Sequence, residues 1–360
     1  MNLAAVRPRH PQLVLLSAAV LVTVAACGAP TQQGGTAKNQ ADSLNALYQR
    51  AKAEGSVSFW GPEDPPDIVK LGAAFNKTYP GIKVKPFEIT ATDMVPKMIA
   101  AAQAGQTTTD IAEGSLSTIQ PLVQHKLLAK FQNWGKLLKL PQGAILENGA
   151  ALAWYNNLQP IAFNTNLVSA QDEPKTWNDL LDPKWKGKIL VESRAMAFSV
   201  LGMQEGDAKM VDYLKKLKAQ DLKFVDGGTT TLQELAAGTG AIAVGAYAYN
   251  IDNYRDQKKA PVDWNAPNPV GASQFVLFSV ANAPHPAAAQ LFMDWLASPR
   301  GLAANKNISG HSSILQGSGS SEAARVQQQG ATMVVETPAN TDLRGKEQES
   351  AAAALGTASK

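Results

Sequence analysis

Residues 57–87 decide the fold, and they read VSFWGPEDPPDIVKLGAAFNKTYPGIKVKPF. The apolar run Val57 to Trp60 predicts a buried strand that ends at Gly61-Pro62, and Ile82 to Phe87 predicts a second strand. Between the two strands, apolar residues recur at helical spacing, at Ile68, Leu71 and Phe75. The order strand, helix, strand is typical of an α/β protein.

The same alternation continues along the chain. Met94 to Gln103 predicts a second helix, and Ala151 to Asn164 predicts a long connecting strand rich in aromatic residues. A further α/β unit begins where the strand Ile189 to Val191 precedes the amphipathic helix Ala208 to Lys218. Even without its first 26 residues, the chain of 360 residues is longer than one hydrophobic core usually supports. We therefore expect two α/β domains.

The composition argues against several functional classes. The 33 Lys and Arg nearly balance the 30 Asp and Glu, so the chain lacks the charge excess that would indicate nucleic-acid binding. Because Cys27 is the only cysteine, no disulfide can form within the chain. There is no P-loop, and the hydrolase patterns Gly-x-Ser-x-Gly, His-Glu-x-x-His and Ser-x-x-Lys are missing. We expect a binding protein without a cofactor, not an enzyme.

The N-terminus has the pattern of an export signal. Arg7 and Arg9 precede an apolar run from Leu13 to Ala26, which is too short to span a bilayer but fits the apolar part of a signal peptide. The end of this run, Val24-Ala25-Ala26-Cys27, resembles the bacterial lipobox. The resemblance implies that residues 1–26 are a lipoprotein signal peptide and that Cys27 carries a lipid anchor outside the cytoplasm. The alternative is a simple secretory signal followed by an unmodified cysteine.

Residues 27–41 are rich in Gly, Thr, Gln and Ala and have little apolar surface. We expect them to form a flexible tether, with the folded body starting near Asp42. The C-terminal residues 345–360 are polar and rich in Ala, and we expect a poorly ordered tail there.

Four segments of the body occur in a characteristic order: Leu47 to Gly55, Phe75 to Val84, Pro174 to Lys188, and Ala283 to Pro286 followed by Phe292 to Leu296. In this combination, from about Ala46 to Leu315, the chain resembles the bacterial extracellular solute-binding proteins of ABC importers. Its closest likeness is to the branch typified by the ferric-iron-binding proteins. That branch carries iron and a range of small polar solutes.

The resemblance implies a type II periplasmic-binding-protein fold, with two α/β lobes joined by crossing hinge strands that close over a solute. Lobe one would comprise residues 42–157 and 272–315, and lobe two residues 158–271, with 316–344 as a candidate addition to it. A monomeric receptor of this kind would hand its small polar solute to an ABC permease, whose ATPase partner works inside the cell.

The binding site of such a receptor lies where strand ends and helix N-termini of both lobes face the cleft. Each candidate also has an ordinary structural role. Trp60 could equally be a core residue, Ser115 and Ser117 could serve simply as helix caps, and Arg194 could be a surface residue. If Arg194 faces the cleft, it can grip an anionic group. The candidate ligand-binding residues are Trp60, Glu63, Ser115, Ser117, Tyr155, Arg194, Thr229, Thr230, Tyr247 and Tyr249.

Iron is the alternative cargo. The ferric branch binds its metal through adjacent tyrosines, whereas Ala248 separates Tyr247 from Tyr249 in this chain. Residues two apart on a helix do not share a face. The ferric branch often has a histidine just after its first strand, where this chain has Gly61-Pro62-Glu63. If iron binds, its ligands would be Tyr247, Tyr249, Glu63 and Glu113, since a hard cation prefers oxygen ligands. We expect instead no metal site and a small polar organic solute that meets Arg194 and a tyrosine.

Two other functional classes stay open from the sequence. A lipid-anchored hydrolase is a distant alternative, because a pair of carboxylates for glycoside hydrolysis cannot be recognised from one sequence. A passive surface adhesin would bind no small solute at all. A hydrolase would convert its substrate to product, whereas a receptor releases its solute unchanged. An adhesin would show no stabilisation by a small solute, whereas a receptor would.

Overall fold

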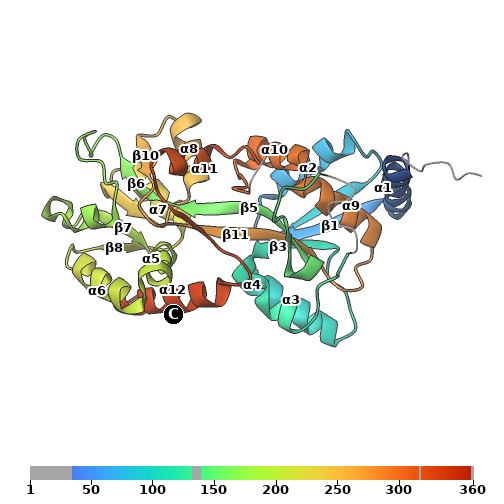
Figure 1. The fold of residues 1–360 in the computed structure, drawn as a ribbon, viewed down its shortest axis with the longest axis horizontal. Coiled ribbons are helices and arrows are strands. Elements are labelled where there is room, and N and C mark those ends of the chain that lie inside the picture. Colours follow the sequence, from blue (N-terminus) through green and yellow to red (C-terminus); the bar gives the residue numbers. More distant parts are fainter. Residues whose placement is uncertain (1–34, 132–138, 316–317, 358–360) are drawn as a thin grey trace, which may run out of the picture.

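The computed structural model describes residues 35–131, 139–315 and 318–357. The expected signal peptide, residues 1–26, and Cys27 lie outside these ranges. The described chain forms two α/β lobes side by side, and the long strands β5 (Ala151–Gln159) and β11 (Val270–Ser279) run between them (Figure 1). The two-lobed α/β architecture expected from the sequence is confirmed.

Lobe one is built on a sheet with the strand order β2-β1-β3-β11-β5-β4, and β12 pairs with β11. Strands β1, β2 and β3 run parallel, whereas β11 is antiparallel to both β3 and β5. The other strands of this sheet are β1 (Ser56–Gly61), β2 (Lys83–Glu88), β3 (Ile111–Ser115), β4 (Ile145–Leu146) and β12 (Met333–Val335).

The helices of lobe one cover both faces of this sheet. They are α1 (Gly35–Glu54), α2 (Pro65–Asn76), α3 (Ala91–Gln103), α4 (Leu116–Gln124), α9 (Pro286–Ala297) and α10 (Pro299–Ser309). Two prolines begin α2, where no intrahelical N–H bond is lost, and its residues Ile68, Leu71 and Phe75 are buried as their spacing predicted. Helix α1 already begins at Gly35, inside the stretch that we expected to be a flexible tether.

Lobe two is built on a smaller sheet with the order β10-β6-β9-β7-β8. Its strands are β6 (Ile161–Asn164), β7 (Ile189–Glu192), β8 (Lys223–Val225), β9 (Ile242–Val244) and β10 (Val262–Asn265). Its helices are α5 (Ser199–Glu205), α6 (Asp207–Lys218), α7 (Gly228–Ala236) and α8 (Ala248–Asp256). Thr176 forms a capping box with Asp179 at the start of the 3-10 turn Trp177–Leu181.

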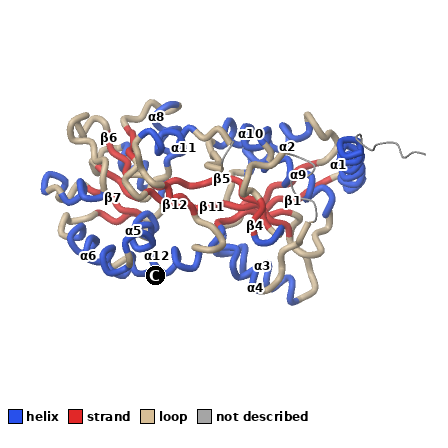
Figure 2. Tube along the Cα trace, in the orientation of Figure 1, coloured by secondary structure: helices blue, strands red, loops and turns tan. Residues whose placement is uncertain are grey.

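Two of the chain crossings between the lobes run along β5 and β11. The first passes from β5 through Pro160 into β6, and the second leads through β11, which pairs with β5 from Phe278 opposite Ala151 to Gly271 opposite Gln159. Every residue of β5 is buried, and Tyr155 stacks on Phe275 of β11 with ring centroids 4.7 Å apart. The tube view shows these strands as the continuous link between the lobes (Figure 2).

The C-terminal segment corrects our expectation of a poorly ordered tail at residues 345–360, for the part up to residue 357 that the structure describes. Helix α12 (Thr341–Leu355) packs on α5 and α6 of lobe two and also contacts α4 of lobe one. It buries Ala351, Ala352 and Leu355 in the core of lobe two, which explains why a sequence of polar appearance is held in place. The segment before it is shared: α11 (Ser321–Gln328) packs on lobe two through Val326, whereas β12 joins the sheet of lobe one.

Candidate functional site

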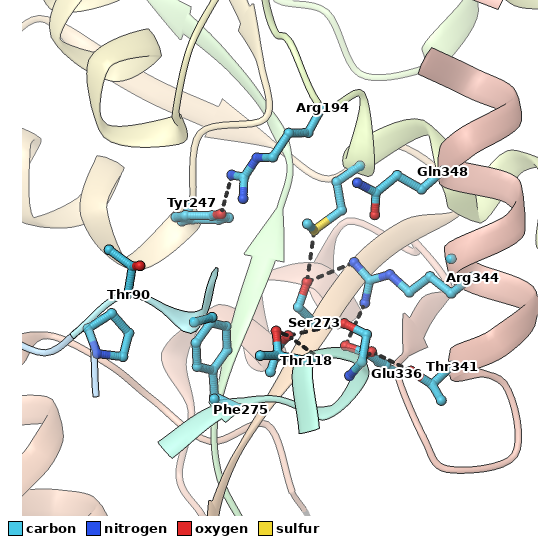
Figure 3. Close-up of a pocket in the computed structure, with 17 residues that line it drawn as sticks. Thr90, Thr118, Arg194, Tyr247, Ser273, Phe275, Glu336, Thr341, Arg344 and Gln348 are labelled. Carbon is cyan, nitrogen blue, oxygen red and sulfur yellow. Dashed lines mark hydrogen bonds and ion pairs between the residues drawn. The ribbon is translucent and has the colours of Figure 1, made fainter. Parts of the chain in front are cut away.

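A cavity of about 420 Å³ lies between the lobes, where elements of both lobes and of the C-terminal segment meet (Figure 3). Its size suits a small molecule. It is lined by Pro62, Thr90, Ala91, Gly114, Ser115, Ser117 and Thr118 of lobe one, by Arg194, Met196 and Tyr247 of lobe two, by Ser273 and Phe275 of β11, and by Glu336, Thr341, Arg344, Gly345 and Gln348 of the C-terminal segment.

Two helix N-termini form the lobe-one wall of the cavity. Thr90 caps α3 by accepting a hydrogen bond from the main-chain N–H of Asp93, and Ser115 caps α4 by accepting one from Thr118. The Ser115 hydroxyl also lies 3.1 Å from the Ser117 hydroxyl. Ser115 therefore both caps a helix and lines the cavity, and helix N-termini favour negative charge in front of them.

Arg194 and Tyr247 form the lobe-two wall. Arg194 follows β7, and its Nε donates to the buried Glu192 at 2.5 Å while an NH2 group donates to the Tyr247 hydroxyl at 3.3 Å. Burial disfavours the guanidinium charge, but Tyr247 and Glu192 outweigh it, and the pKa of Arg194 is raised. The Arg194 side chain keeps 51% of its surface exposed, so part of its donor edge is open to a ligand.

The C-terminal segment closes the remaining side of the cavity. Arg344 donates to Ser273 at 2.8 Å, to Gln159 at 3.1 Å and to Glu336 at 3.4 Å. Sequence reasoning missed Arg344 and Glu336, because it treated residues 316–344 only as a candidate addition to lobe two and assigned no strand or helix there. The only local signal for α12 was its run of strong helix formers from Lys346 to Leu355.

A buried polar cluster surrounds Tyr155 in the middle of β5, and it holds several of the predicted site residues. Glu63 accepts a hydrogen bond from the Tyr155 hydroxyl at 2.8 Å, and His311 Nδ1 is 3.3 Å from the same carboxylate. The His311 ring stacks on Tyr155 at 4.1 Å and touches Tyr249 at the same centroid distance. Since these contacts use the Glu63 and Tyr155 side chains inside the protein, neither lines the cavity.

The two acids of this cluster are hard to ionise. Burial raises the pKa of Glu63 to about 7, although the Tyr155 hydrogen bond opposes the shift. Burial also raises the pKa of Glu113, whose carboxylate is fully buried and made less acidic still by the charge of Glu63. Neither Glu113 oxygen has a hydrogen-bond partner of ordinary geometry, although the Glu63 main-chain N–H is close enough to favour the charged form. His311 stays neutral, because burial lowers its pKa to about 3.

Tyr247 and Tyr249 have different surroundings. Tyr247 lines the cavity at the start of α8, whereas Tyr249 packs against the His311 ring, and the two tyrosine rings lie nearly parallel with centroids 6.2 Å apart. In the part of the chain that the structure describes, no group of three or more His, Cys, Asp or Glu residues is placed to hold a metal ion.

Other predicted residues also lie away from the cavity. Trp60 belongs to the core of lobe one, where its ring meets Phe87 and Lys97. Thr229 and Thr230 lie in the first turn of helix α7, and Thr229 accepts a long hydrogen bond from Asn250. Among the ten candidate ligand-binding residues, the cavity brings together four: Ser115, Ser117, Arg194 and Tyr247.

Solved structures of other proteins share this fold. The substrate-binding protein of an ABC transporter from Agrobacterium tumefaciens is 14% identical, with a TM-score of 0.69 over 85% of this chain and 96% of that one. Iron-bound HitA from Pseudomonas aeruginosa is 18% identical, with a TM-score of 0.68 over 84% and 99%. The apo ferric ion-binding protein A of Pasteurella haemolytica is 17% identical, with a TM-score of 0.68 over 85% and 99%. At such low identity these likenesses show the fold.

Sequence comparison adds a distant relative and a family. An uncharacterised protein of Haemophilus influenzae is 26% identical over 143 residues, which cover 37% of this chain and only 40% of that relative. None of the helices within the described residues is long and apolar enough to cross a membrane. The family of bacterial extracellular solute-binding proteins matches residues 70–335, which is most of the chain. The protein therefore belongs to the bacterial extracellular solute-binding proteins.

Proposed function

We propose that the protein captures a small polar solute in the cavity between its lobes and delivers it to an ABC permease. The observation that carries this proposal is the lining of the cavity: both lobes supply polar side chains to a space of about 420 Å³. Each lobe alone would offer only some of these contacts. Solute binding is thus coupled to the relative position of the lobes, which a permease can recognise.

The polar groups favour a solute with one anionic group. Arg194 presents part of its guanidinium to the cavity, and the hydroxyls of Ser115, Ser117 and Tyr247 are available as hydrogen-bond partners around it. The apolar remainder of the wall, with Met196 and Phe275, suits a carbon skeleton. We infer that the solute is organic and released unchanged, so the protein is not an enzyme.

Ferric iron is a second candidate cargo, because Tyr247 lines the cavity and two neighbours are described as iron-bound or ferric ion-binding proteins. The positions of the other expected ligands weaken it. Tyr249, Glu63 and Glu113 belong to the buried cluster and have their contacts inside the protein or none at all. Iron would therefore require a rearrangement of this cluster.

A screen of small acids, amino acids, phosphonates and ferric citrate by thermal shift tests the proposal. A solute that binds only the native state adds RT ln(1 + [L]/Kd) to the free energy of unfolding. It therefore raises the melting temperature. Arg194→Ala should abolish the shift for the best solute, and Arg50→Ala, which changes an exposed arginine on α1, is the matched control. The bound solute should be recovered chemically unchanged. A solute that binds both variants equally, or that is converted to product, would overturn the proposal.

We further propose that the receptor works as a monomer outside the cytoplasm, anchored to the membrane by a lipid on Cys27 and without nucleic-acid partners. A cognate permease would take the solute, and its ATPase would hydrolyse ATP inside the cell. Replacing Cys27 by Ala should leave an unprocessed precursor or release the protein from the membrane. If the variant still partitions into detergent and is processed as the wild type is, the anchor lies elsewhere.

A further inference from the structure

Glu336 occupies a complete carboxylate-binding arrangement inside the cavity. One oxygen accepts hydrogen bonds from the main-chain N–H of Ser117 at 3.1 Å and from the Thr341 hydroxyl at 2.8 Å. The other accepts from the main-chain N–H of Gln274 at 3.1 Å and from Arg344 at 3.4 Å. The side chain is only 3% exposed. Four donors from α4, β11 and α12 therefore surround a single carboxylate.

These donors are the kind that solute anions receive in binding proteins. A helix N-terminus, a main-chain N–H, a hydroxyl and a guanidinium together stabilise negative charge in a site of low exposure. Arg344 is itself nine-tenths buried, at 4% exposure, and its charge is balanced by Glu336. The anion position at the start of α4 is thus filled by the protein's own side chain. Figure 3 shows this group on the opposite side of the cavity from Arg194 and Tyr247.

The carboxylate comes from a part of the chain that reaches both lobes. Glu336 follows β12 directly and is the first residue after the stretch that matches the family. Beyond it, α12 packs on lobe two and contacts α4 of lobe one (Figure 1). The C-terminal segment therefore keeps Glu336 in the cavity while both lobes hold their positions around it.

We propose that Glu336 is a specificity-determining residue: it fills the anion position at α4, so the cavity accepts a solute with one anionic group on Arg194 and rejects one with a second. This inference rests on the proposed function. A second anionic group at that wall would find the Ser117 N–H and Arg344 already used. It would also face the negative charge of Glu336 inside the cavity, where water screens charges poorly.

The first test uses Glu336→Ala, which leaves the four donors and the buried Arg344 without their carboxylate. We expect this variant to melt at a lower temperature than the wild type, and millimolar acetate to restore much of the loss. Equal concentrations of chloride or acetamide should not restore the melting temperature of Glu336→Ala. Acetate should raise the melting temperature of the wild type far less than that of the variant. A folded Glu336→Ala protein that responds to acetate no more than to chloride would overturn the inference. This readout is independent of the natural solute.

The second test keeps the shape of the side chain. Glu336→Gln removes the charge without leaving a cavity, so it should fold even if the alanine variant does not. We expect its affinity for succinate, measured by calorimetry, to exceed that of the wild type at least about tenfold, because one unit of like charge is removed nearby. Its affinity for acetate should change less than about threefold. Glu88→Gln, an exposed site on β2, is the matched control.

An unchanged ratio of succinate to acetate affinity in Glu336→Gln would show that Glu336 does not set the charge of the solute. Failure of the proposed function looks different. In that case the wild type would bind no solute in the screen and Arg194→Ala would have no effect, while acetate would still restore Glu336→Ala.

Discussion

Replacing Glu63 by Gln should make the protein more stable at neutral pH, although it changes a buried residue. The Glu63 side chain is 9% exposed and lies among Tyr155, His311 and Glu113, with the charges of Asp64 and Asp67 adding to the cost of ionising it. Burial, as the main cause, raises its pKa from 4.5 to about 7. Gln keeps an oxygen that can accept the Tyr155 hydrogen bond but never ionises.

The sign of the effect follows from proton binding. Below pH 4.5 the Glu63 carboxyl is protonated in both the folded and the unfolded chain and contributes nothing to the pH dependence. As the pH rises from 4.5 to about 7, the unfolded chain releases the Glu63 proton first, so the contribution of Glu63 to stability falls. At about 1.36 kcal/mol for each pH unit, the full penalty is on the order of 3 kcal/mol above pH 7. Burial lowers the pKa of His311 from 6.5 to about 3, so its own contribution to stability rises with pH over part of this window. Since His311 is present in both proteins, this contribution cancels when the wild type is compared with Glu63→Gln.

Urea unfolding of the wild type and of Glu63→Gln at a series of pH values measures this difference. We expect the free-energy difference between them to grow in favour of the variant by about 2 to 3 kcal/mol between pH 4.5 and pH 7.5. Glu88→Gln on the exposed end of β2 should run parallel to the wild type at every pH. Parallel pH profiles for Glu63→Gln and the wild type would refute the argument that the folded protein holds this carboxyl protonated.

Three further predictions concern iron, a glycine and the last helix. After loading with ferric citrate and dialysis, the protein should show no visible charge-transfer band, because Tyr247 lines the cavity whereas Tyr249 packs on His311. A retained band that disappears in Tyr247→Phe would establish iron as the cargo. Gly245→Ala should destabilise the protein by more than about 2 kcal/mol in urea unfolding. The reason is that Gly245 has a φ of +104° and that a new Cβ there would collide with the Glu192 side chain. A cost below about 0.5 kcal/mol, which is typical of a surface substitution, would contradict this prediction. Leu355→Ala on α12 should lower the free energy of unfolding by about 2 to 4 kcal/mol, because Leu355 is buried. Leu343→Ala on the same helix should change it little, because Leu343 is 44% exposed. Equally small effects of both substitutions would indicate that α12 does not pack on lobe two.

Much of the fold could be predicted from short stretches of sequence. The apolar run at Val57 and the spacing of Ile68, Leu71 and Phe75 specified β1 and α2, because strand and helix periodicity decides which side chains one face can bury. The length of the chain indicated two cores. The helix α12 escaped prediction because its buried residues, Ala351, Ala352 and Leu355, are too few and small to give a strong apolar pattern.

The site depended far more on tertiary structure. The sequence indicated that Ser115 caps a helix and that Arg194 follows a strand, and both residues line the cavity. It could not tell that Glu63 turns inward to Tyr155, because a loop residue has no periodicity that assigns it a face. Nor could it reveal that the main-chain N–H of Ser117 binds Glu336, a partner 219 positions away. By itself the sequence determined many of the segments that become helices and strands and indicated that they form two lobes. The packing of the lobes and of the C-terminal helix decided which polar groups face the solute, since contacts between distant segments exist only after the chain has folded.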